Sequence, residues 1–102
     1  MKQQNNTSPS ARRSVFIMCN TGNADNAIRQ INNAREYLRE QYDTVSISPH
    51  QLLWPENDII GIAAGNAAKC DTVYLCKGWQ MCKCSLSVFE IARIYNKTII
   101  FE

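Results

Sequence analysis

Four short runs of apolar, β-branched and aromatic residues are spaced along the chain and predict four strands. They are Ser14–Cys19, Thr44–Ser48, Asp71–Cys76 and Thr98–Phe101. The nearly continuous hydrophobicity of the first, third and fourth runs is typical of strands buried on both faces, which is the environment of a parallel sheet. We therefore expect these three strands, including the last one, to be buried.

The segments between these runs predict three helices. In Ala24–Gln41 the apolar residues recur at the helical period and fall within a narrow arc, with charged residues on the opposite face. Glu56–Lys69 follows Pro55, which suits a first helical turn, and is rich in alanine, isoleucine and glycine. Ser85–Asn96 is the third predicted helix.

This alternation of strands and helices predicts one small α/β domain, residues 14–102, after a polar tail, residues 1–13, that we expect to be disordered. Right-handed crossovers and doubly wound packing favour a four-stranded parallel sheet in the order 2-1-3-4, with helices on both faces, as in flavodoxin-like and Rossmann-like folds. Ligands of such sheets bind beyond the carboxyl ends of the strands, at the switch point. We expect Cys19–Gly22 to face Lys77–Trp79 there.

Composition narrows the classes of function. The chain has 102 residues and a net charge of +2, and its charges are scattered, so nothing indicates a nucleic acid partner. No apolar run reaches the roughly 20 residues of a membrane span, so no membrane contact is predicted. The short apolar run after Arg12-Arg13 does not resemble a signal peptide, and we therefore expect a cytoplasmic protein.

Five cysteines in a chain without a secretory signal are expected to be reduced thiols. Cys82-Lys83-Cys84 suggests metal binding. However, structural zinc usually takes two paired ligand sets, and the one histidine, His50, is distant in sequence, so we predict neither a metal nor a cofactor. The remaining cysteines are interpreted as small buried hydrophobic residues: Cys19, Cys70 and Cys76.

Polar and aromatic residues that follow the first and third strands are the candidates for ligand binding. Asn20–Gly22 either bind a phosphate or sugar through backbone N–H groups at a helix start or form a plain turn. Trp79 either stacks on a nucleobase or anchors the core or an interface. His50 either reaches the mouth of the pocket as an acid–base group or lies in solvent. The candidate binding residues are Asn20, Thr21, Gly22, Gly78, Trp79 and Gln80.

Three sequence motifs follow one another in an order that is typical of a known family. They are the turn Ile17–Gly22, the segment Ser46–Pro49 and the strand Cys70–Leu75, with Gly78-Trp79 after it. In their order and spacing the chain resembles the nucleoside 2-deoxyribosyltransferase-like superfamily, most closely a branch of small bacterial and phage domains. The resemblance covers about residues 15–101 and implies a pocket for a nucleoside, a nucleotide or a similar ligand.

The resemblance also implies where a catalytic residue would lie. Active members use a glutamate of the last helix, after a pair of small residues, to attack the anomeric carbon of a deoxynucleoside. The spacing of the family places this glutamate at Val88, facing the pocket, and the small pair at Cys84-Ser85, so the nucleophile is missing and no catalytic residue is assigned. The family's acidic residue in the preceding helix also has no match in Ile59–Ala68. Glu90 lies about 200° further around the helix, and Ser87 with Glu90 fits a capping box.

The sequence thus favours a diverged relative that binds a nucleoside or nucleotide and lacks the nucleophilic glutamate. Two alternatives stay open. One is an active N-glycosidase or deoxyribosyltransferase that uses Glu90 or a residue of a partner subunit, and the other is a protein-interaction module of a phage or mobile element. We also expect a homodimer, because the small apolar residues of Gly61–Ala68 suit a subunit interface.

Overall fold

The predicted strands form one parallel sheet in the computed structural model, which describes residues 12–102. The order of the strands is β2-β1-β3-β4, as predicted. In register, Phe16 lies beside Val45 on one side and beside Val73 on the other. The predicted fold class is therefore confirmed. The bounds are β1 Arg13–Met18, β2 Tyr42–Ser46, β3 Thr72–Leu75 and β4 Thr98–Phe101.

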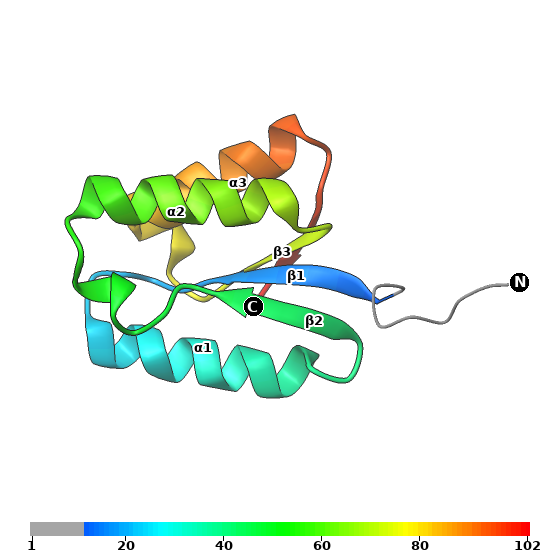
Figure 1. Ribbon diagram of the computed structural model, residues 1–102, viewed down its shortest axis with the longest axis horizontal. Coiled ribbons are helices and arrows are strands. Elements are labelled where there is room, and N and C mark those ends of the chain that lie inside the picture. Colours follow the sequence, from blue (N-terminus) through cyan, green and yellow to red (C-terminus); the bar gives the residue numbers. More distant parts are fainter. Residues whose placement is uncertain (1–11) are drawn as a thin grey trace, which may run out of the picture.

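Three helices cover the two faces of the sheet (Figure 1). α1, Ala24–Leu38, lies on one face, whereas α2, Glu56–Lys69, and α3, Lys83–Ile94, lie on the other. The bounds of α2 agree with the prediction. In the described part of the chain, none of the helices is long and apolar enough to cross a membrane. The α1 residues that were expected to form its apolar face are buried: Ala27, Ile31, Ala34 and Leu38.

Several boundaries differ from the prediction by a few residues. α1 ends at Leu38 rather than Gln41, because the chain turns there and the Gln41 amide donates to the Leu38 carbonyl at 3.0 Å. β2 consequently begins at Tyr42 rather than Thr44. The last helix ends before Asn96, whose φ of 57° is left-handed and stops the helix.

The predicted capping box of Ser87 and Glu90 is not formed. α3 begins at Lys83, one turn before Ser87, and the Ser87 hydroxyl donates to the Lys83 carbonyl at 3.0 Å. A capping side chain needs free backbone N–H groups, which occur only in the first turn of a helix. Tyr95, which falls within the predicted helix Ser85–Asn96, lies beyond the last residue of α3 and is 60% exposed.

The core lies on both sides of the two central strands. Val15–Cys19 and every residue of β3 are buried. β4 was also predicted to be buried, but Thr98 and Phe101 are exposed. The order of the sheet explains the difference, because β4 pairs with β3 alone and is an edge strand.

Arg12 and Arg13, which the sequence assigned to the tail, belong to the domain. Arg13 starts β1. The Arg12 guanidinium donates to the backbone carbonyls of Arg39 and Tyr42 and lies 3.5 Å from the Asp43 carboxylate. These contacts join the entry of β1 to the turn between α1 and β2. The rest of the predicted tail, residues 1–11, lies outside the described residues.

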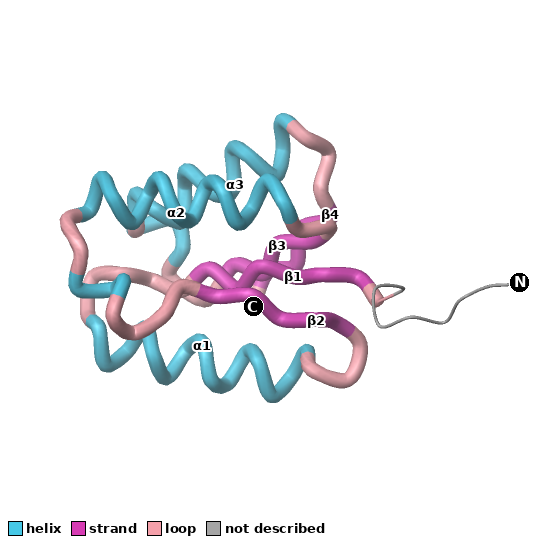
Figure 2. Tube along the Cα trace, in the orientation of Figure 1, coloured by secondary structure: helices cyan, strands magenta, loops and turns pink. Residues whose placement is uncertain are grey.

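The connections that leave the carboxyl ends of β1 and β2 gather at one end of the sheet (Figure 2). β1 passes into α1 through residues 19–23, and the longer connection from β2 to α2 contains one 3-10 turn, Gln51–Leu53. A second 3-10 turn, Trp79–Met81, leads from β3 towards α3. These three connections build the site described next.

Candidate functional site

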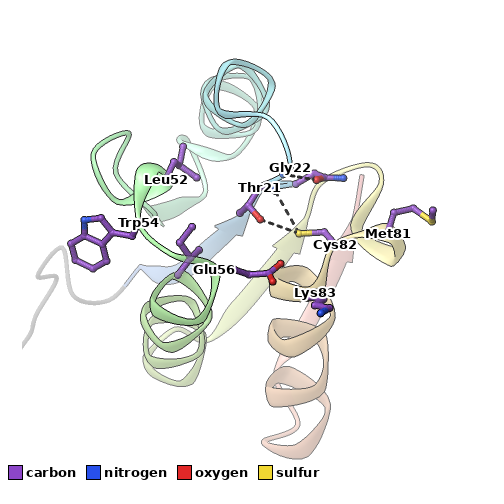
Figure 3. A pocket seen from close by; sticks show the side chains of 10 residues that line it. Thr21, Gly22, Leu52, Trp54, Glu56, Met81, Cys82 and Lys83 are labelled. Carbon is purple, nitrogen blue, oxygen red and sulfur yellow. Dashed lines mark hydrogen bonds between the residues drawn. The ribbon is translucent and has the colours of Figure 1, made fainter.

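A pocket of about 440 Å³ lies beyond the carboxyl ends of β1 and β3. Small-molecule sites typically have volumes of about 300–1,000 Å³. The walls come from the β1–α1 turn, the connection between β2 and α2, and the first residues of α2 and α3 (Figure 3). The pocket therefore lies at the predicted switch point. Its polar and reactive lining residues are Asn20, Thr21, Glu56, Cys82 and Lys83.

Asn20 holds the two loops of the switch point together. Its Nδ2 donates to the Gly78 carbonyl at 3.2 Å, and its Oδ1 accepts from the Gly22 amide at 3.1 Å. Its own backbone amide donates to Gln30 Oε1 at 2.8 Å. The turn that follows β1 is thereby fixed to α1 and to the loop that follows β3.

Gly78 is required by the geometry of this junction. Its φ of 88° and ψ of 9° are left-handed, a conformation that glycine adopts without the steric cost of a side chain. A Cβ atom at this position would also lie only 3.1 Å from Asn20 Nδ2. The residue was predicted to bind a ligand, but in the structure it supports Asn20 and is not part of the pocket lining.

Cys82 forms the end of the pocket next to α3. Its sulfur lies 3.5 Å from both the backbone nitrogen and Oγ1 of Thr21 (Figure 3). Burial raises the pKa of this thiol, but hydrogen bonds with Ser85 and Thr21 outweigh burial and hold the pKa below its ordinary value of 9.0. Since the thiolate is the nucleophilic form of cysteine, Cys82 is the reactive thiol of the pocket.

The other four thiols show the opposite shift. Burial raises the pKa of Cys19 and of Cys76 to about 12. Burial also raises the pKa of Cys70 and of Cys84. Cys82 is therefore the thiol that ionises most readily in this chain.

Glu56 and Lys83 give the pocket one carboxylate and one ammonium group. Glu56 lies in the first turn of α2, and Figure 3 shows its side chain directed towards the start of α3, where Cys82 and Lys83 lie. None of the ion pairs among residues 12–102 involves Glu56 or Lys83. Both groups are thus available to hydrogen-bond a polar ligand.

Glu56 was not among the predicted site residues. An acidic residue in the first turn of a helix is usually explained by the helix dipole, and nothing in the local sequence distinguishes this one. The predicted topology, rather than the local sequence, could have identified Glu56 as a site residue. In a parallel sheet each crossover helix starts at the carboxyl edge of the strands, so the first turn of α2 had to lie near the switch point.

The predicted binding residues separate into two groups. Asn20, Thr21 and Gly22 line the pocket. Trp79 is outside the pocket lining and stacks on Phe89 and Phe101, with ring centroids 5.0 Å and 5.4 Å away. Its position between α3 and the end of β4 fits the interpretation as an anchor of the core.

Two further candidates also lie apart from the pocket lining. Gln80 is exposed in the 3-10 turn that precedes α3. His50 packs edge-on against Trp54, with ring centroids 5.8 Å apart. Trp54 lines the rim of the pocket, but Figure 3 shows its ring turned away from Thr21 and Cys82.

The two positions considered for a nucleophile also lie outside the pocket lining. Val88, expected to face the pocket, is fully buried in the core beneath α3. Glu90 is exposed, and its carboxylate pairs with Arg93 at 2.7 Å. The residues at the implied small pair are buried, and the Ser85 hydroxyl donates to the Cys19 carbonyl at 3.1 Å.

Within residues 12–102, no group of three or more His, Cys, Asp or Glu side chains is arranged to hold a metal ion. Comparison of the chain with protein-family models, with curated proteins and with solved structures gives no match.

Proposed function

We propose that the protein binds a nucleoside or nucleotide in the switch-point pocket and is a diverged nucleoside 2-deoxyribosyltransferase-like protein without the nucleophilic glutamate. The observation that carries the proposal is the composition of the pocket. A carboxylate, an ammonium group and the backbone of Asn20–Gly22 surround one cavity of about 440 Å³ at the carboxyl ends of the strands.

The chemistry of these groups supports a ligand with hydroxyl groups or a phosphate. The Glu56 carboxylate is an acceptor for sugar hydroxyl or base amino groups, and Lys83 supplies the positive charge that suits a phosphate. Thr21 contributes a backbone amide and a hydroxyl on the opposite wall. The resemblance of the strand and loop motifs to the transferase superfamily adds the expectation of a nucleoside.

The positions of Val88 and Glu90 argue against transfer chemistry of the family's usual kind. An attacking carboxylate must reach the anomeric carbon of a bound sugar. Val88 carries no carboxylate and lies in the core, and Glu90 is paired with Arg93 on the outer surface of α3. Glu56 is the carboxylate that lines the pocket, so any residual N-glycosidase activity would have to depend on it.

A matched pair of carboxylate-to-amide substitutions tests the proposal. Deoxyadenosine, deoxyadenosine monophosphate and ribose 5-phosphate are added to the wild type, to Glu56→Gln and to Glu90→Gln. A ligand at 100 times its Kd stabilises the folded state by about 2.7 kcal/mol, which raises the Tm of a small domain by roughly 10–20 °C. Binding by the wild type and by Glu90→Gln, but not by Glu56→Gln, supports the pocket.

The same samples test catalysis. After incubation with deoxyinosine and free adenine, chromatography shows whether the base has been exchanged. We expect no exchange; exchange that is lost in Glu56→Gln but kept in Glu90→Gln would instead identify an active enzyme. If none of the compounds shifts the Tm of the wild type, the proposed ligand class is wrong.

One observation favours a second candidate function, a protein-interaction module. Apolar side chains are exposed around α3 and the edge strand β4, with Phe101 52% exposed and Ile94 62% exposed. Large exposed apolar surfaces are typical of interaction sites. Replacement of Ile94 by Lys, followed by a pull-down from cell extract, would test this function, because Ile94 does not line the pocket.

We also propose a homodimer through Gly61–Ala68 and a cytoplasmic location. Open space in front of α2 supports the homodimer, because a Cβ atom at Gly61 or Gly65 would meet nothing within 4 Å. The five thiols, which form no disulfide within residues 12–102, support the cytoplasmic location. Sedimentation of the wild type and of Gly65→Lys tests the dimer; identical monomeric masses would reject it.

A further inference from the structure

Two cysteines meet at the end of the pocket next to α3 and share one polar neighbour. Cys82 and Cys84 flank Lys83, and their sulfur atoms lie 3.5 Å and 3.6 Å from the same Thr21 Oγ1. The two sulfurs are therefore at most about 7 Å apart. Lys83 alone separates the two cysteines in sequence, and an S–S bond between them requires their side chains to rotate towards each other.

The two thiols differ in access from the pocket. Cys82 lines the pocket, whereas Cys84 is 0% exposed beneath it. The other three cysteines, Cys19, Cys70 and Cys76, are buried and do not line the pocket. A small reagent that enters the pocket therefore meets the Cys82 sulfur first.

The surroundings favour ionisation of Cys82 over Cys84. The Thr21 amide and hydroxyl lie against Cys82, and hydrogen bonds with Ser85 and Thr21 lower the pKa of its thiol. Burial raises the pKa of Cys84, the charges of Cys82 and Glu56 add to this rise, and a hydrogen bond with Thr21 only partly opposes it. Cys19, directly after β1, is also close enough for the charges of both thiolates to raise its pKa.

From this geometry we propose that Cys82 and Cys84 form a dithiol site that reduces small disulfides which enter the pocket. The Cys82 thiolate attacks one sulfur of the disulfide RSSR; a bond forms between Cys82 and that sulfur, the S–S bond breaks, and RS⁻ leaves. Cys84 then gives its proton to the departed RS⁻ and attacks Cys82. The second RS⁻ leaves and takes a proton from water.

The balance of the reaction is complete. Two protein thiols are oxidised to one Cys82–Cys84 disulfide, and RSSR is reduced to two RSH, so two electrons and two protons pass to the small disulfide. A separate thiol reductant must return the protein to the dithiol form. The inference needs only that small molecules reach the pocket, so it does not rest on nucleoside binding.

The pKa values indicate how much faster Cys82 should react than the other thiols. Cys19 and Cys76 have pKa values of about 12, and that of Cys82 is below 9.0, so its thiolate fraction at neutral pH is at least about 1,000-fold larger. Nucleophilicity falls as the pKa falls, with a Brønsted coefficient near 0.4–0.5, which reduces the expected advantage to roughly 30-fold or more.

The experiment follows the five thiols of the full chain during oxidation. Reduced protein is freed of reductant, mixed with oxidised glutathione, quenched with acid at intervals and mapped by peptide mass spectrometry. We expect Cys82 and Cys84 to be lost together, at least roughly 30-fold faster than Cys19 or Cys76, with an internal disulfide and no retained glutathione.

Three variants assign the two roles. Cys84→Ser should retain one glutathione on Cys82, because no second thiol resolves the mixed disulfide. Cys82→Ser should lose its reactive thiol and slow the oxidation of Cys84 by about tenfold or more. Cys70→Ser, at the end of α2 and away from the pocket lining, is the matched control and should behave as the wild type.

Circular dichroism establishes that each variant is folded, and the wild-type time course needs no substitution at all. Faster oxidation of any other cysteine than of Cys82 would overturn the proposal. So would wild-type protein that keeps glutathione on Cys82 without forming the internal disulfide, or thiols that react only after urea is added.

Discussion

The junction between Asn20 and Gly78 leads to the sharpest prediction on stability. Gly78→Ala places a side chain on a residue with a φ of 88°. The left-handed conformation costs an alanine roughly 1–2 kcal/mol. The new Cβ atom would also lie 3.1 Å from Asn20 Nδ2, so the Asn20 amide must move and the hydrogen bond to the Gly78 carbonyl is weakened.

The two effects together set the expected magnitude. Loss of a neutral hydrogen bond destabilises by about 0.5–1.5 kcal/mol, so Gly78→Ala should cost about 2 kcal/mol in total. For a domain of this size, that loss lowers the Tm by roughly 8–16 °C.

The chain contains its own control. Gly61 lies inside α2, where a Cβ atom meets nothing within 4 Å, and its backbone is not left-handed. Alanine is favoured over glycine in a helix interior by about 1 kcal/mol, so Gly61→Ala should raise the Tm by roughly 4–8 °C.

Urea unfolding and thermal melts followed by circular dichroism measure both variants against the wild type. Opposite signs for Gly78→Ala and Gly61→Ala are the expected result. A Gly78→Ala variant as stable as the wild type would show that the Asn20–Gly78 junction is not strained in this way. A Gly61→Ala variant that is destabilised and loses its dimer would instead place a close subunit contact at α2.

Further predictions concern the thiols and position 88. The thiols of Cys19 and Cys76 have a pKa of about 12 in the folded protein and 9.0 in the unfolded chain. The free energy of unfolding should therefore fall as the pH rises from 9 to 12, because the unfolded chain releases these protons first. Each thiol contributes up to about 1.4 kcal/mol per pH unit, and Cys76→Ala should make urea unfolding less sensitive to pH by that amount. Thr21→Val removes the hydroxyl beside Cys82, so alkylation of Cys82 by iodoacetamide should slow several-fold near neutral pH; an unchanged rate would exclude this hydrogen bond as a cause of the low pKa. Val88→Glu buries a carboxyl group in the core, so it should destabilise by several kcal/mol, more at pH 8 than at pH 4, and restore no base exchange. A stable Val88→Glu variant that exchanges bases would show that position 88 reaches the pocket.

The sequence was sufficient for the fold because the information needed is local. The strands read as apolar runs, α1 shows a clear helical period, and the handedness of crossovers then leaves few possible strand orders. Where boundaries shifted, tertiary contacts decided them. An example is the early start of α3 at Lys83, which brings Cys82 against Thr21.

The site was only partly predictable for the opposite reason. Asn20–Gly22 could be identified because the turn after the first strand must lie at the switch point. Trp79 could not be assigned, since an aromatic residue in a loop has the same local pattern whether it binds a base or packs on Phe89 and Phe101. The lowered pKa of Cys82 depends on hydrogen bonds with Ser85, three residues away, and with Thr21, 61 residues away in sequence, and the contact with Thr21 has no local signature.

Thr21 connects the two proposed activities of the pocket. Its amide and hydroxyl stabilise Cys82, and the same residue lines the cavity in which a nucleoside would lie. A ligand that draws Thr21 towards itself weakens the hydrogen bond that the Thr21 amide donates to Cys82, and a Cys82–Cys84 disulfide removes the thiolate that Thr21 faces. By linkage, the factor by which oxidation changes the affinity for the ligand equals the factor by which the ligand changes the oxidation equilibrium. If both proposals are correct, we therefore expect the pocket and the thiol pair to be coupled through one side chain rather than to act as two independent sites.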